Sequence, residues 1–343
     1  MPRRTKKNSA SKIIGFLLMA LSLVILVAIF ALSSYQRELY RPLSPKALRF
    51  EIMRGDSLNK VADRLVENKI LEGRVWFKAS AMLEGISNQL KAGEYVALPG
   101  ITLRELLRLV VSGPVQQHSI VLVEGWNYRQ VLKAVCNHPA IVNTVCDQNP
   151  PDFSAVFGNS THHPEGRFFP DTYYLTKGTT DIDFLKRAAS RMNRVLEQEW
   201  RTRSANLPVK SSYEALILAS IIEKETARAD ERPEISGVFS RRMEQGMLLQ
   251  TDPTVIYGIG ERFDGNIRSA DLVEDTPYNT YVRAGLPPTP ISMPGTASIH
   301  AAVHPNYGDF LYFVARGDGT HYFSATREEH ERAVNEYQLG RRN

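Results

Sequence analysis

Two glutamates at the end of one apolar stretch, Glu223 and Glu225, are the side chains best placed for acid–base chemistry in this 343-residue sequence. They close a predicted helix over residues 211–226. Ser211, followed three residues later by Glu214, has the spacing of a capping box that starts a helix.

Helical spacing separates the two glutamates. At about 100° per residue, Glu225 falls on an apolar stripe, and Glu223 points the other way with small and polar side chains. The stripe consists of Ile217, Leu218, Ile221 and Ile222, and the opposite face carries Leu216, Ala219 and Ser220. A carboxyl group on an apolar face is costly to ionise, so its pKa rises, as a general acid near neutral pH requires. The alternative is that the helix frays and Glu225 reaches solvent.

The N-terminus predicts the compartment. Residues 1–12 carry five cations and no acid, and residues 13–32 contain no charge over twenty residues, enough to cross a bilayer as a helix. Cations before the span and few after it predict a cytoplasmic N-terminus and an exported remainder. A cleaved signal peptide ending near residues 31–33 is the alternative, but the apolar core is long for a signal.

The charge balance follows from this topology. Lys plus Arg total 42 and Asp plus Glu 37, so removing the five tail cations leaves equal numbers in the exported part. We therefore expect no nucleic-acid partner.

Cysteine and histidine spacing bears on redox state and metals. Cys136 and Cys146 lie ten apart in the exported part, where a disulfide and two free buried thiols are both open readings. His162 and His163 are adjacent, and His304, His321 and His330 are scattered. We expect no metal and no cofactor.

The elements that must position the glutamates predict an α+β fold. After a linker over residues 33–45, residues 46–113 read as strand, two helices, strand and helix, with Ser57 and Thr102 as caps. This order and the segment Gly55-Asp56-Ser57-Leu58 resemble a LysM module, a binder of cell-wall glycans. A generic small α+β domain is the alternative. Residues 114–210 include a cap region, and residues 211–343 hold the glutamate helix and loops rich in Gly, Pro and aromatics.

Several longer motifs then occur in order. They are residues 165–173 (EGRFFPDTY), 219–226 (ASIIEKET), 250–258 (QTDPTVIYG), 278–281 (YNTY), 285–288 (GLPP) and His304-Pro305. Together they closely resemble the endolytic murein transglycosylases of the MltG (YceG-like) family. One departure is Thr289, where the family commonly has glycine.

The resemblance implies a single-pass inner-membrane protein whose LysM-like module and catalytic domain, residues 114–343, lie in the periplasm. The family cleaves nascent peptidoglycan strands internally and leaves 1,6-anhydro-muramic ends, which links it to the termination of strand growth and to peptidoglycan synthases. Its catalytic glutamate maps to Glu225, in agreement with the helical spacing.

The expected chemistry uses one acid. Neutral Glu225 protonates the glycosidic oxygen, and as carboxylate it takes the proton of the muramic 6-hydroxyl, which attacks its own anomeric carbon. Sugar-positioning side chains are expected from two loops: Gln250, Thr251, Asp252, Tyr278, Asn279 and Tyr281. Two other readings stay open: a hydrolase that adds Asp252 or Glu223 and water, and a wall-binding scaffold without activity.

Overall fold

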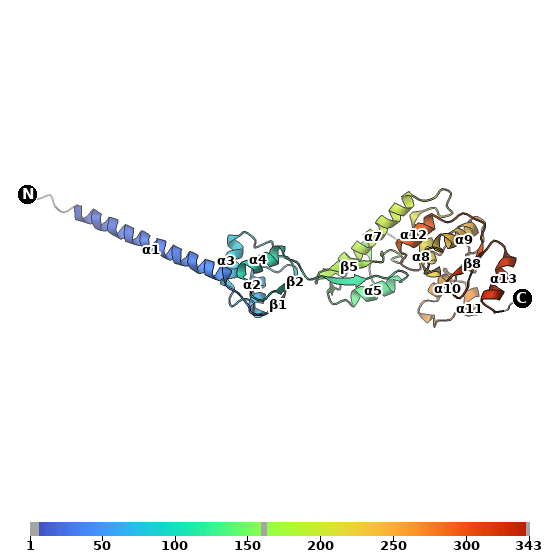
Figure 1. Ribbon diagram of the computed structural model, residues 1–343, viewed down its shortest axis with the longest axis horizontal. Helices are drawn as coiled ribbons and strands as arrows, with labels where there is room; N and C mark the ends of the chain where they lie inside the picture. The colour runs from blue at the N-terminus through green and yellow to red at the C-terminus, as the bar shows by residue number, and fades with distance from the viewer. Residues whose placement is uncertain (1–6, 159–162, 341–343) are drawn as a thin grey trace, which may run out of the picture. The chain divides into compact units, whose positions relative to one another are not determined.

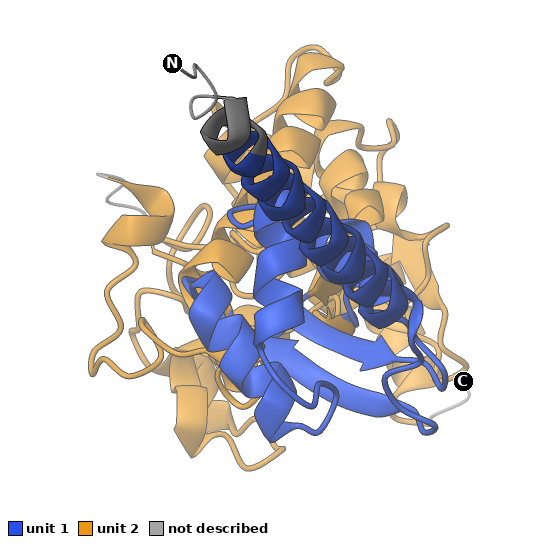
Figure 2. Cartoon of the chain, turned by 90° about the vertical axis from the view of Figure 1, so that its left-hand side faces the viewer, with its two compact units in different colours: residues 1–117, 176–178 blue, residues 118–175, 179–343 orange. Residues whose placement is uncertain are grey.

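The computed structural model describes residues 7–158 and 163–340 (Figure 1). Residues 1–6 of the predicted basic tail, and His162, lie outside the described residues. The chain divides into two compact units (Figure 2). The first comprises residues 1–117 and 176–178, and the second comprises residues 118–175 and 179–343.

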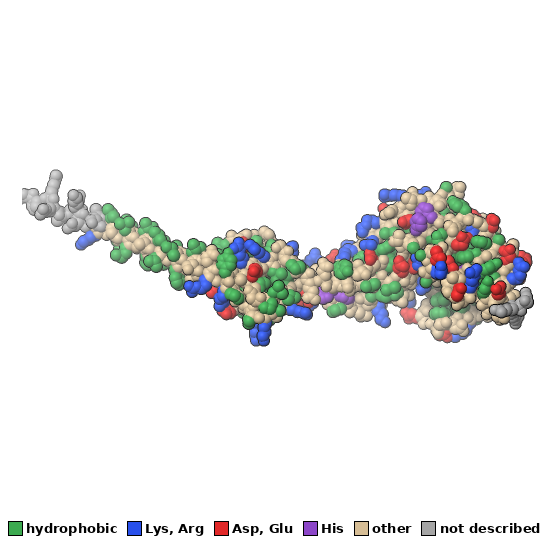
Figure 3. Space-filling view, viewed as in Figure 1, with side chains coloured by type: hydrophobic (Ala, Val, Ile, Leu, Met, Phe, Trp, Pro, Cys, Tyr) green, Lys and Arg blue, Asp and Glu red, His purple; other side chains and the backbone are tan. Residues whose placement is uncertain are grey.

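The first unit begins with a long apolar helix, α1 (Lys7–Tyr40). Within it, Lys12–Tyr40 is long and apolar enough to cross a membrane, with a mean hydropathy of 3.1 in its most apolar window. Apolar side chains are spread along the coloured part of this helix (Figure 3) and are exposed along the predicted span. The predicted charge-free helix over residues 13–32 is therefore confirmed as a helix.

The rest of the first unit follows the predicted order of strand, two helices, strand and helix. The elements are β1 (Leu48–Ile52), α2 (Leu58–Glu67), α3 (Val75–Leu83), β2 (Gly93–Ala97) and α4 (Leu103–Ser112). The strands pair antiparallel, with Phe50 opposite Tyr95. Ser57 and Thr102 cap α2 and α4 as predicted, and the apolar faces of the helices share one core with the strands.

The second unit opens with short strands and three helices. Its elements are β3 (His118–Val121), α5 (Tyr128–Cys136), β4 (Ile141–Val142), α6 (Ser154–Phe157), β5 (Thr172–Leu175), β6 (Thr179–Thr180) and α7 (Asp181–Arg201). Strand β3 pairs antiparallel with β5, and β4 pairs parallel with β6. Cys136 and Cys146 form a disulfide, which decides between the two readings left open by the sequence.

The remainder of the second unit carries the two glutamates. Its elements are α8 (Ser212–Glu225), α9 (Arg232–Glu244), α10 (Asp252–Ile259), the 3-10 helix η1 (Gly260–Arg262), α11 (Ser269–Val273), α12 (Thr296–Val303), β7 (Tyr312–Ala315), β8 (His321–Ser324) and α13 (Arg327–Tyr337). Strands β7 and β8 pair antiparallel. Helix α8 packs against α7, α9, α10 and α12, so it is the central element of the largest core.

The prediction of an amphipathic α8 is wrong. Every residue from Ala215 to Ile222 is buried, because neighbouring helices cover all of its faces. A helix that is apolar on all sides belongs to the middle of a core. Its rigid surroundings fix the position of its C-terminal end, where Glu225 is the last helical residue.

Candidate active site

The start of α8 is set by the predicted cap. The Ser211 hydroxyl accepts a hydrogen bond from the Glu214 backbone N–H at 3.1 Å. The Glu214 carboxylate reaches the Lys210 N–H at 2.6 Å, so the second bond of the predicted capping box goes one residue further back. The cap and the buried core together define where the helix ends.

Glu225 lies at that end, partly buried, with a hydroxyl on its carboxylate. The Thr251 hydroxyl donates to Glu225 Oε1, and Thr251 itself is 2% exposed. Burial raises the pKa of Glu225 to about 7, the Thr251 hydrogen bond opposes that rise, and the charge of Asp252 adds to it. Near neutral pH the group can therefore both give and take a proton.

Glu223 has a different environment. Its carboxylate pairs with Arg232 at 3.2 Å and accepts the Gly295 N–H at 3.0 Å, with both charged side chains less than 10% exposed. The sequence prediction turned Glu223 away from the apolar side, but the structure buries it in an ion pair on another face of α8. Burial, followed by the charge of Glu223, raises the pKa of the neighbouring Glu124. A carboxylate held by arginine and a backbone amide is poorly suited to proton transfer.

Replacing Thr251 by valine tests the hydroxyl on Glu225. We expect Thr251→Val to raise the pKa of Glu225 further, because the bond it removes stabilises the ionised carboxylate. The rate against pH should then begin its alkaline decline at a higher pH than in the wild type. Thr254→Val is the matched control, because that buried hydroxyl bonds the Thr251 carbonyl and Thr280. An unshifted Thr251→Val profile contradicts the assignment.

Three predicted sugar-positioning residues lie where α10 begins: Gln250 and Thr251 before the helix, and Asp252 as its first residue. Gln250 is exposed and has a positive φ of 52°, and its backbone N–H donates to the Thr280 carbonyl. Asp252 is the first residue of α10 and accepts the Tyr281 hydroxyl at 2.6 Å. The structure therefore brings Asp252 and Tyr281 together beside Thr251 and Glu225.

Tyr278 and Asn279 have contrasting surroundings. Tyr278 packs against Tyr257 with ring centroids 4.8 Å apart, and its hydroxyl lies 2.9 Å from the Thr289 hydroxyl. Thr289, the departure from the family pattern, thus provides a partner for Tyr278. Asn279 is 1% exposed, and its amide bonds three backbone carbonyls and the Tyr281 N–H.

A cavity of about 880 Å³ adjoins the end of α8. Lys224 and Pro253, the chain neighbours of Glu225 and Asp252, line it, although Glu225 itself does not. Its walls also include the Tyr257–Tyr278 pair and the first turn of α5. The cavity is large enough for a sugar unit with its substituents.

A second buried carboxyl, Glu165, lines this cavity and was not among the predicted site residues. Glu165 accepts the Tyr128 N–H at 3.0 Å, the Gly166 N–H at 3.3 Å and the Tyr257 hydroxyl at 2.9 Å. Burial raises its pKa to about 7 against these hydrogen bonds. Its isolated position in the sequence gives no periodic signal, and only its place in the EGRFFPDTY motif marked it.

Glu165→Gln is expected to weaken the pH dependence of stability. Because the folded-state pKa is raised, the folded chain holds a proton that the unfolded chain releases above about pH 4.3. This group's contribution to the free energy of unfolding therefore falls as pH rises from about 4.3 to about 7. Denaturant titrations at pH 5 and pH 8 should show a fall smaller by about 2.5 kcal/mol in the variant than in the wild type. Equal falls contradict the assignment.

The fold and the site define the class of protein. It is an α+β domain in which a buried helix ends at an acid that accepts a threonine hydroxyl, and a cavity adjoins that end of the helix. The chain belongs to the YceG-like family, whose sequence model matches residues 50–336.

Individual relatives agree with this family. The chain is 29% identical over 323 residues to the endolytic murein transglycosylase of Bacillus subtilis (strain 168), covering 88% of this chain and 89% of that protein. It is 34% identical over 180 residues to the endolytic murein transglycosylase of Streptococcus pneumoniae (strain D39), covering half of this chain and 32% of that protein. A crystal structure of a yceG-like protein from Listeria monocytogenes aligns with a TM-score of 0.53 at 28% identity, covering 84% of this chain and 99% of that one.

Proposed function

We propose that this chain is a membrane-anchored endolytic lytic transglycosylase that cleaves the bond between N-acetylmuramic acid and N-acetylglucosamine in nascent murein strands. The observation that carries the proposal is Glu225, a partly buried acid with a pKa of about 7 at the end of the central helix. The names of the curated relatives support the substrate and the class of reaction.

The proposed reaction needs one acid and no water. Neutral Glu225 gives its proton to the glycosidic oxygen as the bond from the muramic anomeric carbon to that oxygen breaks. The glucosamine unit leaves with a 4-hydroxyl. The Glu225 carboxylate then takes the proton of the muramic 6-hydroxyl, whose oxygen bonds the anomeric carbon to give a 1,6-anhydro end. The acid is regenerated protonated, so no other proton source is required.

The two loops supply the groups that we propose position the sugars. Asp252 and Tyr281 carry polar atoms near Glu225, and Tyr278 offers an aromatic face at the cavity. Gln250, directly before Thr251, offers an exposed amide. Thr251 acts through Glu225. Asn279 is buried, and its side-chain amide bonds backbone groups of its own loop. We therefore propose that it holds the loop in its conformation and does not make the sugar contact expected from the sequence.

The remaining parts of the proposal concern the location of the site and the role of each unit. We propose that α1 anchors the chain in the inner membrane with its N-terminus in the cytoplasm and the two units in the periplasm. The strand–helix–helix–strand order of the first unit supports a LysM-like module that binds glycan. Residues 114–343 are then the catalytic domain, which terminates strand growth next to peptidoglycan synthases.

A second candidate function is hydrolysis with Asp252 as the second carboxylate. The observation in its favour is the charge of Asp252, which lies close enough to Glu225 to raise its pKa. In that reaction Asp252 activates a water, and the product carries a reducing end. Against it, the Tyr281 hydroxyl occupies Asp252 Oδ1.

Mass spectrometry of the products separates the candidates. The full-length chain in detergent micelles is incubated with purified glycan strands, and the new ends are identified by mass. Anhydro-muramic ends in internal fragments support the transglycosylase. Reducing ends support the hydrolase, and uncleaved strands indicate a binding scaffold.

A further inference from the structure

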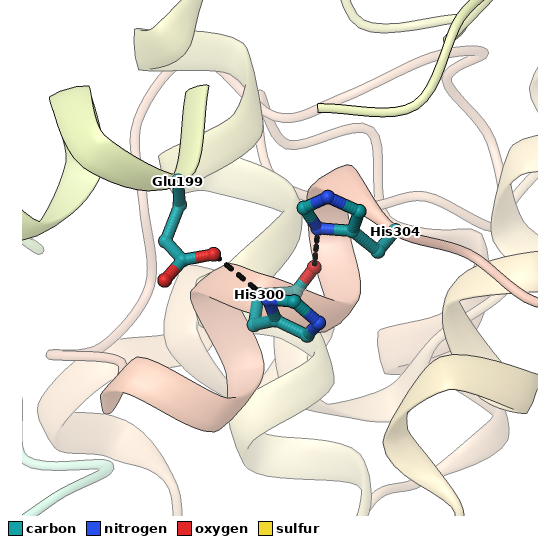
Figure 4. A group of neighbouring side chains, drawn as sticks. All are labelled: Glu199, His300 and His304. Carbon is teal, nitrogen blue, oxygen red and sulfur yellow. Dashed lines mark hydrogen bonds and ion pairs between the residues drawn. The ribbon is translucent and has the colours of Figure 1, made fainter. Parts of the chain in front are cut away.

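A cluster of three potential metal ligands lies on a different part of the second unit. Glu199 comes from α7, His300 comes from α12, and His304 is the residue that directly follows α12 (Figure 4). The two imidazoles lie together, with ring centroids 4.2 Å apart. One ligand atom from each of the three residues lies within 4.8 Å of the others. The expectation of no metal counts His304 among the scattered histidines and leaves out His300, four residues before it.

Both ring nitrogens of His304 face carbonyl oxygens, an arrangement that favours a positive charge at this cluster. His304 Nε2 lies 2.7 Å from the Thr202 carbonyl oxygen, and Nδ1 lies 3.2 Å from the His300 carbonyl oxygen. A neutral imidazole has one N–H, so it can satisfy only one of these two acceptors. The other nitrogen directs a lone pair toward a carbonyl unless it carries a proton or turns to bind a metal ion. Donation to the Thr202 carbonyl leaves Nδ1 as the ligand, the arrangement usual for metal-bound histidine.

The other two side chains complete a mixed nitrogen and oxygen set. His300 Nδ1 lies 2.8 Å from Glu199 Oε2, which leaves His300 Nε2 and Glu199 Oε1 for a metal ion. The Glu199 side chain is 13% exposed and therefore held in place, whereas the His300 side chain is 56% exposed and free to turn. Two imidazoles and one carboxylate are a common ligand set for zinc.

Binding requires a defined movement. The two rings are stacked, with centroids 4.2 Å apart and planes at 18°, but imidazole lone pairs lie in the ring plane. His304 Nδ1 faces the His300 carbonyl oxygen at 3.2 Å, which leaves no room for an ion about 2.1 Å from Nδ1, so the His304 ring must turn away from that oxygen. The exposed His300 ring must leave the stack as well, so that both lone pairs point at one ion. Ligand atoms around tetrahedral zinc are about 3.4 Å apart, so the cluster must close by up to about 1.4 Å.

We propose that Glu199, His300 and His304 bind one divalent transition-metal ion of the zinc type, with water in the open position. The ion joins α7 to α12, and α12 packs directly against α8. Its role is to stabilise the helices behind Glu225, without contact with the substrate. Because a bound ion stabilises only the folded chain, the metal should raise the melting temperature.

Metal titration tests the proposal without any murein substrate. The full-length chain, without an affinity tag, is stripped with EDTA, transferred to detergent micelles and titrated with Zn²⁺ by calorimetry and with Co²⁺ by visible absorption. We expect one equivalent to bind, a visible Co²⁺ spectrum with nitrogen ligands, and a higher melting temperature with Zn²⁺. His300→Asn and His304→Asn should each weaken binding by at least roughly tenfold, and Glu199→Gln should weaken it too.

His330→Asn is the matched control, because it removes a histidine from α13 and should leave the titration unchanged. The melting temperatures are also measured in EDTA, where no metal is bound. All variants should then melt close to the wild type, so that a loss of metal binding is not mistaken for a loss of folding. Unchanged affinity in both His300→Asn and His304→Asn overturns the proposal. Absence of metal binding by the wild type also overturns it. In that case the cluster is a protonated histidine paired with Glu199.

Discussion

Glu225→Gln is expected to lower the rate of murein cleavage by about 10²–10⁴-fold, the usual contribution of a general acid or base. The amide has nearly the shape of the acid and can still accept the Thr251 hydroxyl, but it cannot give a proton to the glycosidic oxygen. Stability should change little, because no charge partner is lost. The measurement is the rate of release of new strand ends by the full-length variant, together with its unfolding midpoint in denaturant.

Glu223→Gln is the matched control for this prediction. It makes the same chemical change two residues away, at a carboxylate held by Arg232 and the Gly295 amide. We expect it to lose stability and to keep the chemistry. A folded Glu225→Gln variant that cleaves at the wild-type rate, with an inactive Glu223→Gln variant, reverses the two roles.

Arg232→Met is expected to lower the free energy of unfolding by about 3–5 kcal/mol, because it leaves Glu223 as a buried charge without its partner. Both side chains of this pair are less than 10% exposed. Glu124 nearby also loses a favourable charge, since Arg232 opposes the rise in its pKa. Equilibrium denaturant unfolding at neutral pH measures the loss.

Two further variants define the origin of that loss. Arg327→Met breaks a pair with Glu331 in which the two side chains are 77% and 60% exposed, so it should cost at most about 1 kcal/mol. The double variant Arg232→Met with Glu223→Gln should recover part of the loss, because the unpaired charge is gone. Equal losses in Arg232→Met and Arg327→Met would show that the buried pair stabilises the fold no more than an exposed one.

Local signals in the sequence predicted where helices and strands lie, but they predicted less well what packs around them. Ser211, Ser57 and Thr102 mark helix starts by side-chain chemistry that needs no tertiary context, and the structure confirms all three caps. The apolar N-terminal helix and the order of elements in the first unit are confirmed for the same reason. Family membership, expected from several motifs in order, is confirmed as well.

The candidate site was predictable only in part, because its surroundings come from distant segments. Helical spacing turned Glu223 away from the apolar stripe, but α9 brings Arg232 to it and buries both. Similarly, the partners of Glu165 include Tyr128 and Tyr257, 37 and 92 residues away. The disulfide also depends on a chain path between Cys136 and Cys146 that spacing alone does not determine. The hydrophobic periodicity of a helix shows which residues share a face, but it does not show which neighbouring element covers that face.

In the proposed mechanism Glu225 works alone, and the muramic 6-hydroxyl, not water, attacks the anomeric carbon. Cleavage by the full-length chain in water enriched in heavy oxygen distinguishes these two nucleophiles, with the new strand ends analysed by mass spectrometry. We expect anhydro-muramic ends that carry no heavy oxygen. Reducing ends carrying one heavy-oxygen atom each contradict this mechanism and point to hydrolysis.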